Sequence, residues 1–352
     1  MESFFSEGED SFETCLGSPV LRQHEKLWLK DGNVVLMVNK DMLFKVHRSI
    51  LSVHSAVFKD MFAMPQPAYP DEEDMYDGCP LVRLSDAPED MGIFLDIFYN
   101  GIPYLQSRTE ATWTIVRVLL LLGSKYAADR LYDEGVRQLE RRYPPTIRAL
   151  HAVQPGKECM DFKFEDCISI ANVTRTLRLD RFYYNALYDC CQLDTKDLLS
   201  GVERSPGVYE MLDEEDLIRC VDGRGRLQRV YFAMMGDAFK ATPDNRDESR
   251  LCGRLIDLFR SEKIETSVPN DYTGKYDPLR VHVSNKWFQT GCKRLCGRCA
   301  AFYVQRDEAR MQEVLDNLKE YFDLEEPNTD YAVRRLFGVE SPFMLVPRSG
   351  LV

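Results

Sequence analysis

The stretch of residues 32–62 constrains the fold more than any other part of this 352-residue chain. Its apolar residues first follow the two-residue period of a β-strand, the chain turns at Asn39-Lys40-Asp41, and the alternation resumes up to Val46. The period then changes to that of two short helices, and Ser55 is placed to cap the second helix through its hydroxyl. A hairpin that leads into a helical pair is a compact nucleus, and we expect other elements to cover it.

The order and spacing of these residues resemble the BTB/POZ domain, most closely the version found in many fungal proteins. The family pattern is an Asp/Asn-Val strand, a second strand that ends in His and a basic residue, and then a Leu, a Ser and two Phe-type residues. The matching positions here are Asn33-Val34, Val46-His47-Arg48, Leu51, Ser55, Phe58 and Phe62. The resemblance covers residues 27–143 and implies an α+β domain, with a sheet of three or more strands flanked by helices, that ends at residue 144.

Later segments continue this pattern. Residues 81–84 read as a short strand, and Asp86 with Glu89 reads as a capping box that starts a helix. That helix is expected to end near Asn100-Gly101, because glycine suits a left-handed C-cap. Two amphipathic helices follow, and Pro144-Pro145 stops the second of them.

The net charge of −12 is concentrated outside this predicted domain core. Residues 1–26 carry a net charge of −4, and residues 65–80 carry −5 together with four prolines. We therefore expect an acidic, disordered tail over residues 1–26 and an acidic exposed insertion over residues 65–80. The remaining chain is close to neutral, which argues against a nucleic-acid partner.

Residues 145–340 read as helices, and residues 341–352 as a loose tail. No alternating strand pattern stands out in this region, which is similar, through weak motifs, to the helical C-terminal portion of fungal BTB proteins. Four arginines lie close together at Arg219, Arg224, Arg226 and Arg229. They read as a solvated helix face or as a binding site for an acidic partner.

Three cysteines, Cys292, Cys296 and Cys299, form the one candidate metal site. Two thiols separated by two residues, one of them glycine, are typical of a zinc knuckle. The fourth ligand would have to be Cys252, Cys220 or His282, and Cys252 completes the candidate set. The alternative is that the three cysteines line one face of a single helix as small buried side chains.

The sequence shows no enzymatic or membrane signature. It lacks GxSxG, P-loop, GxGxxG and HExxH motifs, so we expect no catalytic residues, no cofactor and no enzyme activity. The N-terminus is acidic and has no apolar segment typical of a signal peptide, and the longest aliphatic run, residues 118–122, is too short to span a membrane. We therefore expect a cytoplasmic or nuclear protein with reduced thiols.

The family resemblance implies protein partners. BTB domains form homodimers or bind other proteins, and many link a substrate to a cullin ubiquitin ligase; in some, an N-terminal segment docks on the partner subunit. Many dimeric members have an acid before the first-strand Val and a base after the His, which form a charged pocket. Arg48 matches the base, whereas Asn33 replaces the acid, which loses the charge-assisted pair and leaves at most a neutral hydrogen bond.

The candidate interaction pocket comprises Asn33, His47, Arg48, Ser55, Phe58 and Phe62. The alternatives to an interaction module are a transcription-associated nuclear scaffold and, more remotely, an enzyme or metal-binding activity in the helical half.

Overall fold

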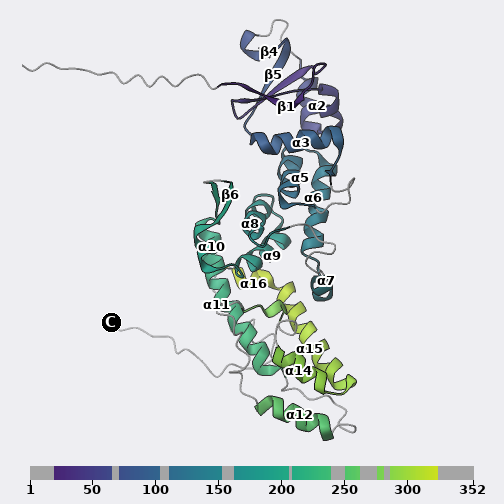
Figure 1. Cartoon of the computed structure of the whole chain (residues 1–352), viewed down its shortest axis with the longest axis vertical. Coiled ribbons are helices and arrows are strands. Elements are labelled where there is room, and N and C mark those ends of the chain that lie inside the picture. Colours follow the sequence, from purple (N-terminus) through teal and green to yellow (C-terminus); the bar gives the residue numbers. More distant parts are fainter. Residues whose placement is uncertain are drawn as a thin grey trace, which may run out of the picture. The chain divides into compact units, whose positions relative to one another are not determined.

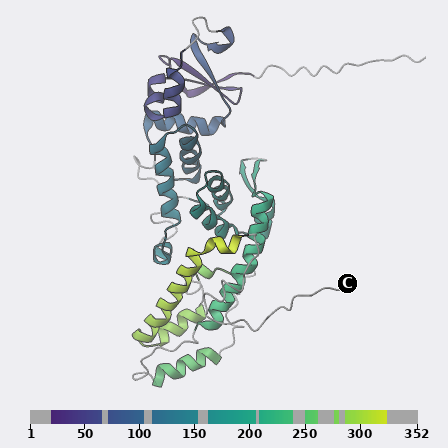
Figure 2. The ribbon, with the colours of Figure 1, turned by 180° about the vertical axis from the view of Figure 1, so that it is seen from behind.

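The computed structural model describes residues 20–65, 71–103, 111–152, 162–205, 208–238, 250–261, 276–280 and 286–323. The chain divides into two compact units. The first unit comprises residues 1–107 and 125–129, and the second comprises residues 108–124 and 130–352. Figures 1 and 2 show the ribbon from opposite sides.

A mixed five-stranded sheet with the order β1-β3-β2-β5-β4 forms the centre of the first unit (Figure 1). Its strands are β1 (Arg22–Trp28), β2 (Val34–Val38), β3 (Met42–Val46), β4 (Met75–Tyr76) and β5 (Cys79–Leu84). β2 and β3 form the predicted antiparallel hairpin, with Val34 opposite Val46. β1 pairs in parallel with β3, and β5 pairs in parallel with β2. The hairpin is therefore central and almost wholly buried, in agreement with its apolar character.

Two segments that the sequence predicted to lack regular structure contain strands. β1 begins at Arg22, inside the segment expected to be a tail. Within the acidic insertion, Asp77 and Gly78 both have positive φ and join β4 to β5 as a two-residue hairpin turn. Lys45 Nζ lies 2.7 Å from Asp77 Oδ2, so an acid of this insertion has an ion-pair partner on the sheet. Residues 1–19 and 66–70 lie outside the described residues.

The α-helices described in the first unit are α1 (Arg48–His54), α2 (Ala56–Ala63) and α3 (Pro88–Asn100). The predicted cap is confirmed, because Ser55 Oγ accepts a hydrogen bond from the backbone N–H of Phe58 at 3.1 Å. Gly101, with a φ of 76°, ends α3 as predicted.

The predicted capping box of α3 is wrong. The N-cap is Ala87, which makes no side-chain cap. Asp86 instead accepts hydrogen bonds at 2.6 Å from Lys125 Nζ and from the Tyr126 hydroxyl. A charged donor and a half-buried hydroxyl are stronger partners for the carboxylate than an exposed backbone N–H.

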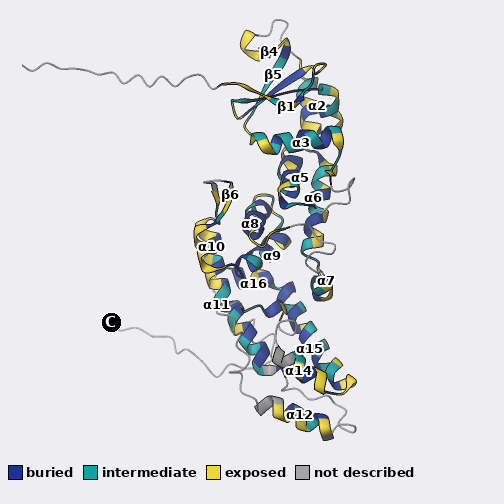
Figure 3. Cartoon of the chain, viewed as in Figure 1, coloured by how far each residue is buried: buried dark blue, intermediate teal, exposed yellow. Residues whose placement is uncertain are grey.

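The second unit is mainly helical. It begins with α5 (Trp113–Lys125) and α6 (Asp129–Arg142), of which Lys125 and Asp129 are assigned to the first unit. The helices that follow are α7 (Ile147–Ala152), α8 (Asp166–Thr176), α9 (Asp180–Cys190), α10 (Thr195–Ser200), α11 (Glu214–Asp237), α12 (Arg250–Ser261), α14 (Lys286–Arg294), α15 (Gly297–Asp316) and α16 (Leu318–Phe322). Figure 3 shows α8 as mostly buried, in contrast to the exposed outer side of α11. The placement of a domain boundary at residue 144 stays a prediction.

A short hairpin interrupts the helices. β6 (Val202–Ser205) and β7 (Val208–Glu210) pair antiparallel, although the sequence analysis found only helices beyond residue 145. Arg204 lies 2.9 Å from Glu210 across the pair. The Pro206-Gly207 dipeptide between the strands is a turn signal that could have revealed the hairpin; those two residues lie outside the described part of the chain.

Three of the four arginines of α11 form neither a solvated helix face nor a binding site for an acidic partner. The exception is Arg229, which is exposed. Arg224 donates hydrogen bonds to the carbonyls of Cys191, at 2.9 Å, and of Leu193. Arg226 is 5% exposed and donates to the carbonyls of Tyr321 and Asp323. These carbonyls belong to the ends of α9 and α16, where helices lack internal donors. The arginines thus join helices within the second unit.

Two glycines of α11 should respond to alanine in opposite ways. A Cβ at Gly223 would lie 2.6 Å from the ring of Phe322, which is fully buried, whereas a Cβ at Gly225 would meet nothing within 4 Å. We expect Gly225→Ala to raise the free energy of unfolding by about 1 kcal/mol, from helix propensity alone. The free energy of unfolding of Gly223→Ala should be about 1–3 kcal/mol lower than that of Gly225→Ala, because the methyl added at position 223 overpacks the core. Hydrogen exchange of the α11 amides in both variants, followed in urea, tests this, and equal stabilities would contradict the close approach.

Candidate interaction surface and cysteine group

His47, at the end of β3, is held by hydrogen bonds within the first unit. Its backbone N–H donates to the Tyr99 hydroxyl at 2.9 Å, and its Nδ1 lies 3.0 Å from the same oxygen. Its Nε2 lies 3.3 Å from Asp31 Oδ2. Both ring nitrogens therefore have a partner, and the role of His47 is to connect β3 to α3. Tyr99 belongs to the run that continues the family pattern, but its contact with His47, like that of Asp31, was not predicted, because both partners are distant from His47 in the sequence.

Arg48 and Asn33 do meet, but not as a side-chain pair. Asn33 Oδ1 accepts a hydrogen bond from the backbone N–H of Arg48 at 2.9 Å and so satisfies the first turn of α1. The Arg48 guanidinium lies 4.8 Å from the centre of the Phe62 ring and donates to the Phe62 carbonyl at 3.1 Å. The neutral bond predicted for Asn33 exists, whereas the guanidinium is used to hold the end of α2.

Ser55 and Phe58 are each 1% exposed. Ser55 Oγ donates to the Tyr126 carbonyl at 2.6 Å, and the Phe58 ring stacks on the Tyr126 ring with centroids 4.7 Å apart. Neither side chain is accessible to a partner. The six motif residues thus comprise a buried frame and a few surface positions, and the interaction pocket expected from them stays a prediction.

The exposed surface next to this frame is apolar, and the sequence analysis missed it. Val53 is 77% exposed, Val57 40% and Met64 62%. With the half-buried Met61 they recur at intervals of four, four and three residues along α1 and α2. Val57, Met61 and Met64 have the spacing of one helix face on α2 and its C-cap, whereas Val53 lies in the last turn of α1, before the extended Ser55. The part of this apolar surface on α2 could therefore have been read from the sequence. We call Val53, Val57, Met61 and Met64 the apolar stripe.

Among the described residues, the sheet of the first unit also ends in a strand whose outer edge has no neighbouring strand. β1 is the outermost strand next to β3, and the exposed Val20 and Leu21 precede it. Such an edge presents backbone N–H and C=O groups to a further strand. The opposite edge strand, β4, has only two residues.

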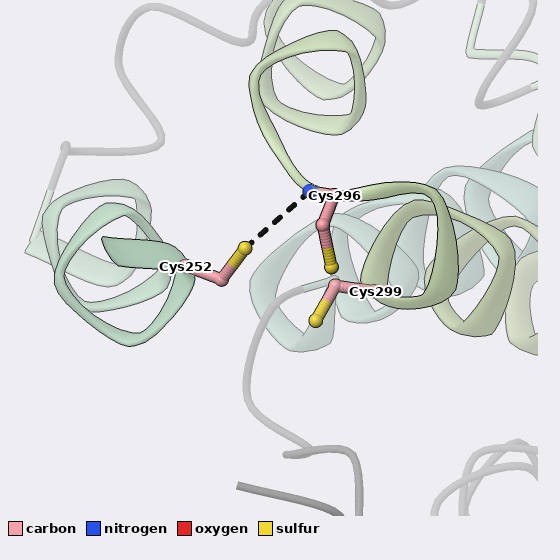
Figure 4. A group of neighbouring side chains, drawn as sticks. All are labelled: Cys252, Cys296 and Cys299. Atoms are coloured by element: carbon pink, nitrogen blue, oxygen red, sulfur yellow. Dashed lines mark hydrogen bonds between the residues drawn. The ribbon is translucent and has the colours of Figure 1, made fainter. Parts of the chain in front are cut away.

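The cysteine group of the second unit differs from the predicted set by one member. The sulfur atoms of Cys252, Cys296 and Cys299 all lie within 4.8 Å of one another (Figure 4). Cys292 is buried and is not a member of this group. The reading of three cysteines on one helix face is wrong, because α14 ends at Arg294 and Cys296 is the N-cap of α15.

The other two ligand candidates do not join this group in the described structure. The Cys220 thiol lies 3.8 Å from the Leu187 carbonyl, and His282 lies outside the described residues. The three grouped thiols differ in environment. The backbone N–H of Cys299 lowers the pKa of the exposed Cys296 thiol, whereas burial raises the pKa of Cys299 to about 12.

The model of the BTB/POZ domain family matches residues 22–142. The match begins at β1 and includes the hairpin, α1, α2 and α3, in the order that the sequence predicted. The chain contains a BTB/POZ domain. BTB/POZ domains are non-catalytic protein–protein interaction modules. The match covers about a third of the chain and leaves most of the helical region outside it.

A search of the curated proteins found no match to the chain. None of the described helices combines the length and apolar character that crossing a bilayer requires.

Proposed function

We propose that this protein is a non-enzymatic interaction module that forms a homodimer through its BTB/POZ domain. The observation that carries the proposal is the apolar stripe on α1 and α2, because a group of exposed apolar side chains is typical of protein interfaces. The motif residues fix α1 and α2 on the sheet and so hold the stripe in place.

The second copy of this chain is the partner that we favour for the stripe. A two-fold dimer would bring the same stripe from each subunit together, and an apolar surface is complementary to itself. The open edge of β1 lies on the same unit and supports the proposal, because a strand from a second copy can extend the sheet there.

Replacing Val53 with lysine should weaken the dimer. Val53 lies in the last turn of α1, where a cation is favourable, so the subunit should fold normally. In the dimer the charge would be buried without a partner, and we expect the dissociation constant to rise at least about tenfold, equivalent to about 1.4 kcal/mol. Light scattering coupled to gel filtration over a dilution series measures this.

The matched control is Val221→Lys, which introduces the same charge at a 52% exposed valine of α11 in the second unit. It should leave the dissociation constant unchanged. A monomeric wild-type protein, or equal weakening by both variants, would refute dimerisation through the stripe.

The sharper form of this proposal is a substrate adaptor of a cullin ubiquitin ligase in the cytoplasm or nucleus. It rests on the function of many BTB domains and is tested by titrating the full chain with the N-terminal region of a cullin scaffold. Saturable binding at micromolar or lower concentration supports the adaptor role and makes the helical unit the candidate substrate receptor. No binding by a dimeric protein removes the adaptor role and leaves the self-associating module.

A further inference from the structure

The thiols of Cys252, Cys296 and Cys299 converge from two helices that are far apart in sequence (Figure 4). Cys252 belongs to α12, while Cys296 and Cys299 belong to the first turn of α15. Cys252 and Cys299 are buried, and Cys296 is exposed. The site is therefore closed on the side of the core and open to solvent at Cys296.

The spacing of the sulfurs suits a thiolate-bound metal. Zinc binds thiolates at about 2.3 Å in a tetrahedral arrangement, which places the sulfurs about 3.8 Å apart. The three sulfurs here lie within 4.8 Å of one another, so each has to move by less than about 1 Å to reach this geometry. The exposed side chain of Cys296 can make this adjustment by rotation alone.

Backbone donors point at the sulfurs. The N–H of Cys296 donates to Cys252 Sγ at 3.3 Å, the hydrogen bond that Figure 4 shows as a dashed line. Cys296 is the N-cap of the 20-residue α15, so the N–H groups of the first turn of that helix lie next to it in the chain. Donors of this kind stabilise a thiolate more than a thiol, and ligand-orienting hydrogen bonds are general around metal sites.

α12 packs on the second unit through a short apolar face. Among its residues whose side chains are described, Cys252 and Ile256 are buried, while Leu251 is 72% and Leu258 45% exposed. Cys252 and Ile256, with the partly buried Leu255, join the small core that contains Cys292, Leu295, Cys299 and Tyr303. A bond between Cys252 and α15 would fix α12 against this core.

We propose that Cys252, Cys296 and Cys299 bind one zinc ion that links α12 to α15, with the fourth position open to solvent beside Cys296. Binding replaces the three thiol protons, which pass to solvent, by three zinc–sulfur bonds, and no electrons are transferred. The three protein ligands would hold the two helices together, as in a structural zinc site, but the fourth coordination position would be open. A water or the side chain of a bound protein can occupy it.

The test is the zinc content of tag-free, full-length protein, measured by elemental analysis after gel filtration. We expect about one zinc per chain. Cys296→Ser should lower the zinc affinity by more than the roughly 10–100-fold that the loss of an outer-shell partner costs. Because Cys296 is exposed, this variant should fold, and the circular dichroism of the helices checks that it does.

Cys292→Ser is the matched control, because Cys292 is a neighbouring cysteine outside the group. It should retain wild-type zinc content. Cobalt-substituted protein should show thiolate-to-cobalt absorption that Cys296→Ser reduces and Cys292→Ser leaves unchanged. A wild-type zinc content no higher than that of Cys296→Ser, equal loss in both variants, or a disulfide among the three cysteines by peptide mapping would overturn the site.

Discussion

Replacing Phe58 with alanine should lower the stability of the BTB/POZ domain by about 3–5 kcal/mol, the largest effect that we expect from a single substitution in this chain. Phe58 is 1% exposed, and its ring stacks on Tyr126 with an interplanar angle of 5°. Tyr126 in turn lies against Phe94, with ring centroids 5.7 Å apart. Loss of the Phe58 ring would leave a cavity between α2, α3 and the segment that carries Tyr126.

The cavity should remain open, because two features hold its walls. Ser55 Oγ ties the start of α2 to the Tyr126 carbonyl, and Asp86 accepts a hydrogen bond from the Tyr126 hydroxyl. Tyr126 is thus fixed at both its backbone and its ring, and it cannot move into the space. A site that cannot collapse lies at the upper end of the range for large-to-small substitutions.

Hydrogen exchange of the amides in α1, α2 and α3, followed in urea, measures this effect within the first unit. A global unfolding curve would mix the two units of the chain. The control is Lys59→Ala on the exposed side of the same helix, which should change the stability by less than about 0.5 kcal/mol. A loss below about 1 kcal/mol for Phe58→Ala would mean that the ring is not part of a tightly packed core.

Arg226→Met should destabilise the second unit by about 3 kcal/mol, because the two hydrogen bonds lost have a charged donor. Methionine keeps much of the apolar stem, so packing is largely preserved and the loss reports on the guanidinium. Nη1 of Arg226 donates at 2.9 Å to the Tyr321 carbonyl and at 2.8 Å to the Asp323 carbonyl. Without it, the carbonyls at the end of α16 lose their donor.

The effect of Arg226→Met should appear as faster hydrogen exchange of the amides in α11 and α16, followed in urea. Arg229→Met is the matched control, because Arg229 is exposed and bonds only to the Gly225 carbonyl of its own helix among the contacts described. It should change stability by less than about 0.5 kcal/mol. Equal effects of the two substitutions would contradict this role of Arg226 and support the solvated helix face that the sequence suggested.

Local patterns were enough to predict the first half of the BTB/POZ domain. The change of period after Val46, the cap at Ser55 and the glycine at 101 act within a few residues, so their physical causes are all contained in the sequence. Asp77-Gly78 was an equally local signal, but the surrounding acids and prolines concealed it. The part of the apolar stripe on α2 was also readable, since Val57, Met61 and Met64 have the spacing of one helix face.

Partners distant in sequence could not be predicted, because competition between them is settled only in three dimensions. The sequence predicted Asp86 as the cap of α3, but its carboxylate binds Lys125 and Tyr126 instead. A charged donor and a hydroxyl bind a carboxylate more strongly than a backbone N–H does. The arginines of α11 had a solvated face as their local reading, but the ends of α9 and α16 supplied carbonyls without internal donors. The cysteine group is a further example. The sequence predicted Cys292 as a ligand together with its neighbours, but the helix breaks before Cys296 and Cys292 lies in the core. The third member of the group is Cys252 of α12.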